Sequence, residues 1–342
     1  GILLARPFKI VRMGPVRLTR ALIVASVALC VVGWFVLVET RHPIVPMALY
    51  VAVEVITGED IRRSGVRTLP EALRMSPGVH VARTDAHTWS INARGLNTGS
   101  NKLLVLVDGR STYSPLFSGV FWDVQDTVLE DLDRIEVFRG SGGPLWGANA
   151  VNGVVNVITR HSKDTQGAFV GAGGGTEERA FGSFRYGGEM AENVHFRVFE
   201  KYVAVDESGL HSTSNDADDA GSAIRGGFRL DWEPADDDAV MFTGEIYDGS
   251  LSQINRATLP AAPFSAVTVD DVSVSGGFLL GRWNHRASEA SDVQVQMYYD
   301  RTARAIPALF QEVRDTFDLA AQHRFRPADD HEIVWGAGYR VT

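Results

Sequence analysis

A strict two-residue alternation of apolar and polar side chains along residues 165–342 constrains the fold most. It is clearest in VQVQMYYD, where every second residue from Val293 to Tyr299 is apolar or aromatic and the residues between them are polar. The same period recurs around Phe196, Phe228 and Trp335. Because successive side chains of a β-strand point to opposite faces, the pattern predicts a series of strands with one apolar and one polar face.

The lengths of these segments and of their links favour a membrane barrel over a soluble sandwich, which would also alternate. We expect about nine strands of roughly ten residues, the length that a tilted membrane strand needs, whereas sandwich strands typically have about 5 to 6. Short polar links (GGEMAEN, EPADDD, RASEAS, RPADDH) interleave with longer ones near 205–221, 251–271 and 304–310. Outer-membrane barrels have this asymmetry, with tight periplasmic turns and long extracellular loops. The acidic link DESGLHSTSNDADDAG is then an extracellular loop, whose charge either attracts cationic ligands or is only a solvated surface.

The N-terminal segment resembles an export signal. Residues 21–38 form an uncharged apolar run after several basic residues. This order is typical of signal peptides, although the run exceeds their usual apolar length of about 7 to 15 residues and approaches that of a spanning anchor. We therefore predict that residues 1–50 are a signal peptide or an extension read from an upstream start.

Composition narrows the possible functions. The net charge of -9 argues against nucleic-acid binding, which needs a basic face. Cys30 is the only cysteine, so the chain has no intramolecular disulfide and no thiolate metal cluster.

The sequence of residues 51–162 predicts a small mixed α/β domain. Helix starts are expected at Thr57 and at Thr68, where Glu71 completes a capping box. Brief strands are expected in VHVAR, WSINARG, KLLVLVDGR, DRIEVFRG and GVVNVITR, each bounded by turn residues.

Seven segments of this domain resemble, in order, the plug of TonB-dependent receptors: ITGEDI, LPEAL, SPGV, INARG, LVLVDGR, DRIEVFRG and GANAVNGVVNVITR. The resemblance implies a mainly β protein: a small α/β plug at 51–162, followed at 165–342 by the first strands of an antiparallel transmembrane β-barrel. That barrel has about 22 strands in such transporters, so about nine form a truncated barrel that we expect not to transport by itself.

The resemblance also implies roles for individual residues. Arg94 and Arg139 match arginines that pair with glutamates on the inner barrel wall and latch the plug; the alternative is that both are ordinary surface arginines. Other plug-loop residues are expected either to face a ligand or to pack. The candidates are Arg83, His87, Trp89, Tyr113, Phe117, Phe121 and Trp122.

We find no catalytic or metal-ligand pattern and expect no enzyme activity and no cofactor. A dinucleotide-binding loop in IEVFRGSGGPLWG is disfavoured, because Pro144 interrupts it and a strand follows instead of a helix. That loop and the acidic pI are the only support for a soluble α/β enzyme.

The resemblance implies a receptor in the outer membrane of a Gram-negative bacterium that imports a scarce nutrient such as an iron siderophore, haem or cobalamin. Its expected partners are the TonB energy-coupling protein of the inner membrane, outer-membrane lipid and a small-molecule ligand, possibly a metal chelate. Glu39–Val45 is the candidate TonB box. The alternative is a non-transporting structural or adhesion protein that also serves phages or bacteriocins as a receptor.

Overall fold

The computed structural model describes residues 3–4, 8–12, 53–93, 103–140, 146–147, 149–209, 216–258, 263–307, 309–328 and 331–342. The chain divides into two compact units. Unit 1 contains Gly1–Val16, Asp85–His87 and His161–Thr342, and unit 2 contains Arg17–Thr84 and Thr88–Arg160. The apolar run 21–38 and the candidate TonB box lie outside the described residues. No helix in the described part of the chain is long and apolar enough to cross a membrane.

Two short helices follow strand β3, Val53–Thr57, in unit 2, and their starts were predicted correctly. Helix α3, Gly58–Ser64, has a capping box between Thr57 and Asp60, and α4, Leu69–Leu73, has one between Thr68 and Glu71. In each box the threonine hydroxyl accepts the backbone N–H three residues later, and the acid accepts the N–H of the threonine. Helix α3 ends at Gly65, whose φ of 73° is a left-handed conformation that suits glycine.

A five-stranded mixed sheet in the order β3-β8-β9-β6-β7 forms the centre of unit 2. Its strands are β3 Val53–Thr57, β6 Leu103–Val107, β7 Arg110–Ser111, β8 Leu132–Arg139 and β9 Gly153–Thr159. A separate hairpin pairs β4, Val79–Arg83, with β5, Trp89–Ala93. The 3-10 helices η3, Trp122–Val124, and η4, Leu129–Asp131, precede β8. Apolar residues of both helices, both sheets and η3 pack into one core. The predicted small α/β domain is therefore present.

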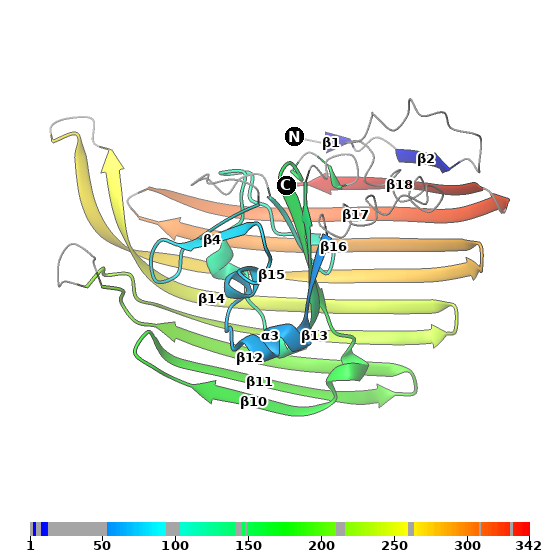
Figure 1. Cartoon of the computed structure of the whole chain (residues 1–342), viewed down its shortest axis with the longest axis horizontal. Coiled ribbons are helices and arrows are strands. Elements are labelled where there is room, and N and C mark those ends of the chain that lie inside the picture. Colours follow the sequence, from blue (N-terminus) through cyan, green and yellow to red (C-terminus); the bar gives the residue numbers. More distant parts are fainter. Residues whose placement is uncertain are drawn as a thin grey trace. The chain divides into compact units, whose positions relative to one another are not determined.

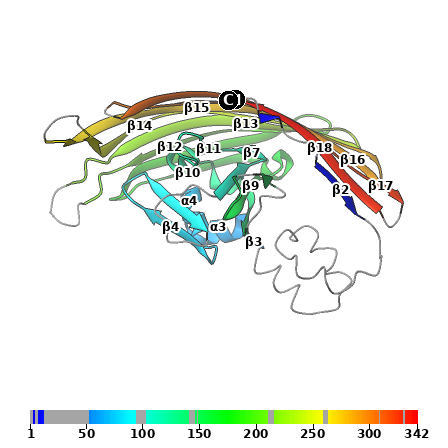
Figure 2. The same cartoon turned by 90° about the horizontal axis from the view of Figure 1, so that it is seen from above.

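The described part of unit 1 contains nine consecutive antiparallel strands from residue 167 onward, the number expected from the alternation (Figure 1). They are β10 Gly167–Gly173, β11 Glu178–Ala191, β12 Val194–Val205, β13 Gly221–Ala235, β14 Asp238–Thr258, β15 Ser265–Ser288, β16 Ser291–Ile306, β17 Phe310–Ala328 and β18 His331–Val341. Strands β1, Leu3–Leu4, and β2, Phe8–Arg12, pair with β18 at the end of this series. Within the unit, the long strands curve together as one continuous sheet (Figure 2).

Several strands are longer than the predicted ten residues, and two of the three predicted long loops are shorter than expected. Strands β14 and β15 have 21 and 24 residues, because their ladder continues through Thr258 and Ser265 into the segment expected to be the loop 251–271. The segment 304–310 is also mostly strand. The asymmetry of the links is confirmed: they are short at one end of the sheet, as at Asp236–Asp237, and longest at 206–220 on the other.

The faces of this sheet are inverted relative to a soluble protein. On β16, Tyr298 is 2% exposed, and Gln296 and Asp300 are also buried, whereas Met297 is 52% exposed. Strands β14 and β15 likewise expose large apolar residues, Ile246 and Trp283. A soluble sandwich buries its apolar face, whereas barrel strands in a membrane turn that face to lipid. The sheet therefore has the side-chain distribution of transmembrane barrel strands.

Candidate functional site

Paired charges occupy the buried polar face of the long sheet. The alternation places Arg225 and Arg229 of β13 on the same face as Glu245 of β14. Arg225 Nη1 donates to Glu245 Oε1 over 2.7 Å, and Arg229 donates through Nε and Nη2 to both carboxylate oxygens of Asp231 over 2.8 Å. In the first pair, the Arg225 side chain is 4% exposed and the Glu245 side chain is 12% exposed. Charge-assisted pairs of this kind satisfy groups that would otherwise be costly to bury.

Asp231 also anchors the segment that enters the long sheet. Its Oδ2 accepts hydrogen bonds from Ser162 N and Ser162 Oγ over 2.8 and 2.7 Å. Ser162 opens the 3-10 helix η5, Ser162–Thr165, whose N-cap is His161. The His161 ring lies 3.7 Å from carboxylate oxygens of Asp231 and Glu233. Asp231 thus fixes the start of β10 to β13 within unit 1.

A second buried carboxylate, Asp219, lies in the long link between β12 and β13. Its Oδ1 accepts Ser208 N over 2.6 Å, and its Oδ2 accepts Ser208 Oγ and Ala86 N, the latter over 2.7 Å. Burial alone raises the pKa of Asp219, but the hydrogen bonds from Ser208 and Ala86 and the nearby His87 outweigh it, so the pKa is lowered overall. Asp219 therefore carries its charge while it organises the surrounding backbone.

Of the two arginines predicted to latch the plug, the structure describes Arg139. Arg94 lies outside the described residues. Arg139, at the end of β8, donates from Nη1 to Pro77 O, and its Nη2 lies 3.9 Å from Glu54 Oε2, so these partners belong to its own unit. Pairing of Arg139 with a barrel glutamate stays a prediction.

All seven residues predicted to face a ligand are among the described residues. Arg83 pairs across the hairpin with Trp89, and the guanidinium groups of Arg74 and Arg83 lie 5.3 and 5.4 Å from its ring centroid. Trp122 is 4% exposed and belongs to the domain core, which is the packing role.

Two further aromatic candidates, Phe117 and Phe121, pack edge to face with ring centroids 4.6 Å apart. Tyr113 is half-buried nearby in the chain. His87 belongs to unit 1, is buried, and its Nε2 donates to Ser252 O over 2.8 Å. The role of these residues toward a ligand stays a prediction.

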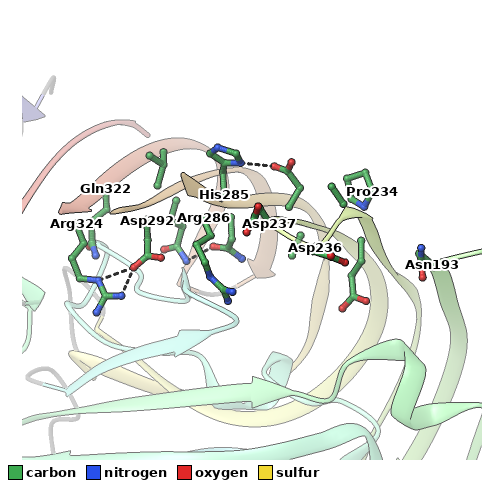
Figure 3. Close-up of a pocket in the computed structure, with 16 residues that line it drawn as sticks. Asn193, Pro234, Asp236, Asp237, His285, Arg286, Asp292, Gln322 and Arg324 are labelled. Atoms are coloured by element: carbon green, nitrogen blue, oxygen red, sulfur yellow. Dashed lines mark hydrogen bonds and ion pairs between the residues drawn. The ribbon is translucent and has the colours of Figure 1, made fainter. Parts of the chain in front are cut away.

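A polar cavity of about 830 Å³ lies at the short-link end of unit 1. Figure 3 shows the ion pair of Arg324 with Asp292 on one side and the acidic turn residues Asp236 and Asp237 on the other. A second pair in its lining joins His285 Nδ1 to Asp238 Oδ1 over 2.9 Å. Among the described residues, no group of histidine, cysteine or carboxylate side chains has the geometry of a metal site.

Sequence reasoning did not single out Asp219 or Asp231, the two buried carboxylates described above. Asp231 could have been found, because the alternation already placed it on the polar face with Arg225 and Arg229. Asp219 carries no such signal, because it lies within the acidic run DADDAG of a link, where its neighbours Asp216 and Asp218 are exposed.

The sequence of unit 2 decides the family. The family model described as TonB-dependent Receptor Plug Domain matches residues 46–154, which include β3 to β8 and the start of β9. These residues are a TonB-dependent receptor plug domain. The plug is followed by barrel strands, since the fold of the siderophore receptor PirA from Acinetobacter baumannii matches 84% of this chain with a TM-score of 0.63 at 17% identity. The two sequence relatives reported below are described as a transporter and a receptor.

Curated relatives match part of this chain. The vitamin B12 transporter BtuB of Vibrio vulnificus is 33% identical over 142 residues, which cover 41% of this chain and 23% of that protein. The ferric enterobactin receptor of Pseudomonas aeruginosa is 27% identical over 243 residues, which cover 59% of this chain and 32% of that receptor. The match to PirA covers 48% of its length, so the chain spans about half of a solved receptor and less of the curated relatives.

Proposed function

We propose that the protein carrying this chain is an outer-membrane receptor that takes up a scarce nutrient by TonB-dependent transport. The observation that carries the proposal is the combination of a plug domain with strands whose apolar face is exposed and whose polar face is buried. The first feature belongs to this receptor family, and the second suits strands that contact lipid. A signal peptide within residues 1–50 would direct export.

We propose a ligand of the kind named for its relatives, a cobalamin or an iron siderophore, with haem as a further candidate. The ligand would bind to plug loops and to the long links of the sheet. The TonB protein would then supply energy from the inner membrane. In this proposal Arg94 and Arg139 latch the plug until that energy is used.

The test is growth and uptake in a Gram-negative host that lacks its own receptors. The full-length gene is expressed with and without a functional TonB, and labelled cyanocobalamin, ferric enterobactin and haem are supplied in turn. We expect accumulation of one of these ligands that disappears without TonB. A protein that fractionates with the outer membrane but never supports TonB-dependent uptake would instead favour a structural protein or a phage receptor.

A further inference from the structure

We propose that Asp219 is a positioning residue that joins the long link between β12 and β13 to the segment Asp85–His87, so that a ligand that displaces one also displaces the other. The inference rests on the proposed function, because it concerns how a receptor would respond to its ligand. It identifies a residue that the plug-family match does not include, since Asp219 lies beyond residues 46–154.

The first step concerns the hydrogen bonds that the Asp219 carboxylate accepts. Asp219 is 1% exposed and accepts hydrogen bonds from three donors on two separate segments. Ser208 supplies its backbone N–H and its hydroxyl from the start of the link, and Ala86 supplies a backbone N–H from 133 residues away in the sequence. One side chain therefore sets the distance between Ser208 and Ala86.

The second step is a parallel connection through His87. His87 donates to Ser252 O, and Ser252 N donates over 2.7 Å to Ala220 O, the residue after Asp219. Ala86 and His87 are both buried, as is Leu251 beside Ser252. Two consecutive residues, Ala86 and His87, thus hold the segment Asp85–His87 beside the place where the link ends and β13 begins to pair with β14.

The third step is the organisation of the link itself. Ala217 N donates over 2.8 Å to Ser208 O, and an isolated bridge pairs Gly209 with Asp216. The two ends of the link are therefore hydrogen-bonded to each other next to this bridge. A ligand that spreads or twists these ends would change the position of Ser208 relative to Asp219.

Asp219 differs from Asp231 in how its charge is held. Asp231 is paired with the guanidinium of Arg229. In the part of the chain that the structure describes, Asp219 is held by backbone N–H groups and a serine hydroxyl, without an arginine or lysine ion pair. Hydrogen bonds weaken steeply when their distance and angle change. Small shifts of Ser208 or Ala86 would therefore release Asp219, whereas Asp231 would stay in place.

The experiment measures accessibility at residue 86 in the full-length receptor in whole cells. Ala86→Cys is labelled with a membrane-impermeant maleimide in three backgrounds: wild type, Asp219→Asn and the matched control Asp218→Asn. Asp218 is the exposed neighbour, and its φ of 47° suits asparagine, so the control makes the same chemical change without loss of these bonds. Heat-modifiable electrophoretic mobility confirms a folded barrel in every variant.

We expect Asp219→Asn to raise the labelling rate by at least about tenfold, since hydrogen bonds to a charged group are lost and 1.4 kcal/mol corresponds to tenfold. Asp218→Asn should match wild type. Ser208→Ala, which removes one of the three donors, should give a smaller rise and replaces Asp219→Asn if that variant does not fold. Equal labelling of the Asp218 and Asp219 variants would overturn the proposal, as would an unchanged rate for Ser208→Ala when that variant is the substitute.

A second readout separates coupling from simple structural support. Cyanocobalamin and ferric enterobactin are added as probes, and labelling at residue 86 is measured again. The probe that the receptor transports should change labelling in Asp218→Asn and not in Asp219→Asn. A change of equal size in both variants would show that Asp219 does not couple the two segments. If neither probe is taken up, the proposed function fails for these ligands, while the ligand-free comparison still decides whether Asp219 positions residue 86.

Discussion

Strand β8 of the plug and the long sheet both alternate apolar and polar residues, but they bury opposite kinds of side chain. In β8, Ile135 and Val137 are fully buried, and the polar residue Glu136 lies between them. In the sheet, Arg225 is 4% exposed, whereas Ile246 is 73% exposed. Alternation therefore predicts that a strand has two different faces, but the surrounding solvent decides which of them is buried.

This difference changes what stabilises each region. Burial of apolar area stabilises the plug, at roughly 25 cal/mol per Å². The sheet gains less from that effect, since its apolar face meets lipid, and it depends on complete backbone pairing and on satisfied charges at its buried face. A substitution should therefore cost most in the sheet when it breaks a buried charge pair, and most in the plug when it removes buried apolar area.

The largest effect is expected from Arg225→Ala in the sheet. The substitution leaves Glu245 buried without the 2.7 Å partner, and such a loss costs about 3 to 5 kcal/mol. The exposed pair of Arg301 with Asp315 provides the control, since Arg301→Ala should cost at most about 1 kcal/mol. The free energy of unfolding of the full-length protein in detergent micelles measures both. Equal losses would mean that burial does not distinguish the two pairs.

A somewhat smaller effect is expected from Ile246→Arg on the exposed face of β14. An arginine on a lipid-facing strand costs about 2 to 4 kcal/mol near the bilayer midplane and less toward the interface. Ser250→Arg, on the same face where β14 becomes polar, is the matched control. The yield of folded protein in lipid vesicles should fall for the first variant and change little for the second. If the sheet were a soluble surface, both arginines would be tolerated.

The features that sequence predicted are those that depend on local chemistry. The helix starts at Thr57 and Thr68 follow from residues within three positions of each other, and the nine strands follow from side-chain period. The missed features depend on pairing between distant segments. The loop predicted at 251–271 became a ladder because each strand extension finds its partner in the other, and the role of Asp219 requires Ala86, which the sequence places far away.

A third prediction concerns the plug, whose helices depend on local caps that the sheet does not use. Thr68→Ala removes the hydroxyl that accepts Glu71 N and should destabilise α4 by about 1 kcal/mol. Thr68→Ser keeps an oxygen at that position and should restore most of the loss. Amide hydrogen exchange is the measurement, with faster exchange expected in α4 and no change in β14. Exchange that rises equally in both regions would mean that plug and sheet unfold as one cooperative unit.

The smallest effect is expected from Glu59→Gln, at the exposed start of α3. Hydrogen bonds from Arg62 and Arg63 lower the pKa of Glu59 from 4.5 to about 2. A lowered folded-state pKa contributes stability above the unfolded value, and this contribution is lost as pH falls from 4.5 toward 2. The variant should therefore be slightly less stable than wild type at neutral pH and equal to it near pH 2. Unfolding measured over this pH range tests the sign, and added salt should shrink the difference because the pairs are exposed. A difference that persists unchanged at pH 2 would show that Glu59 acts through packing and not through its charge.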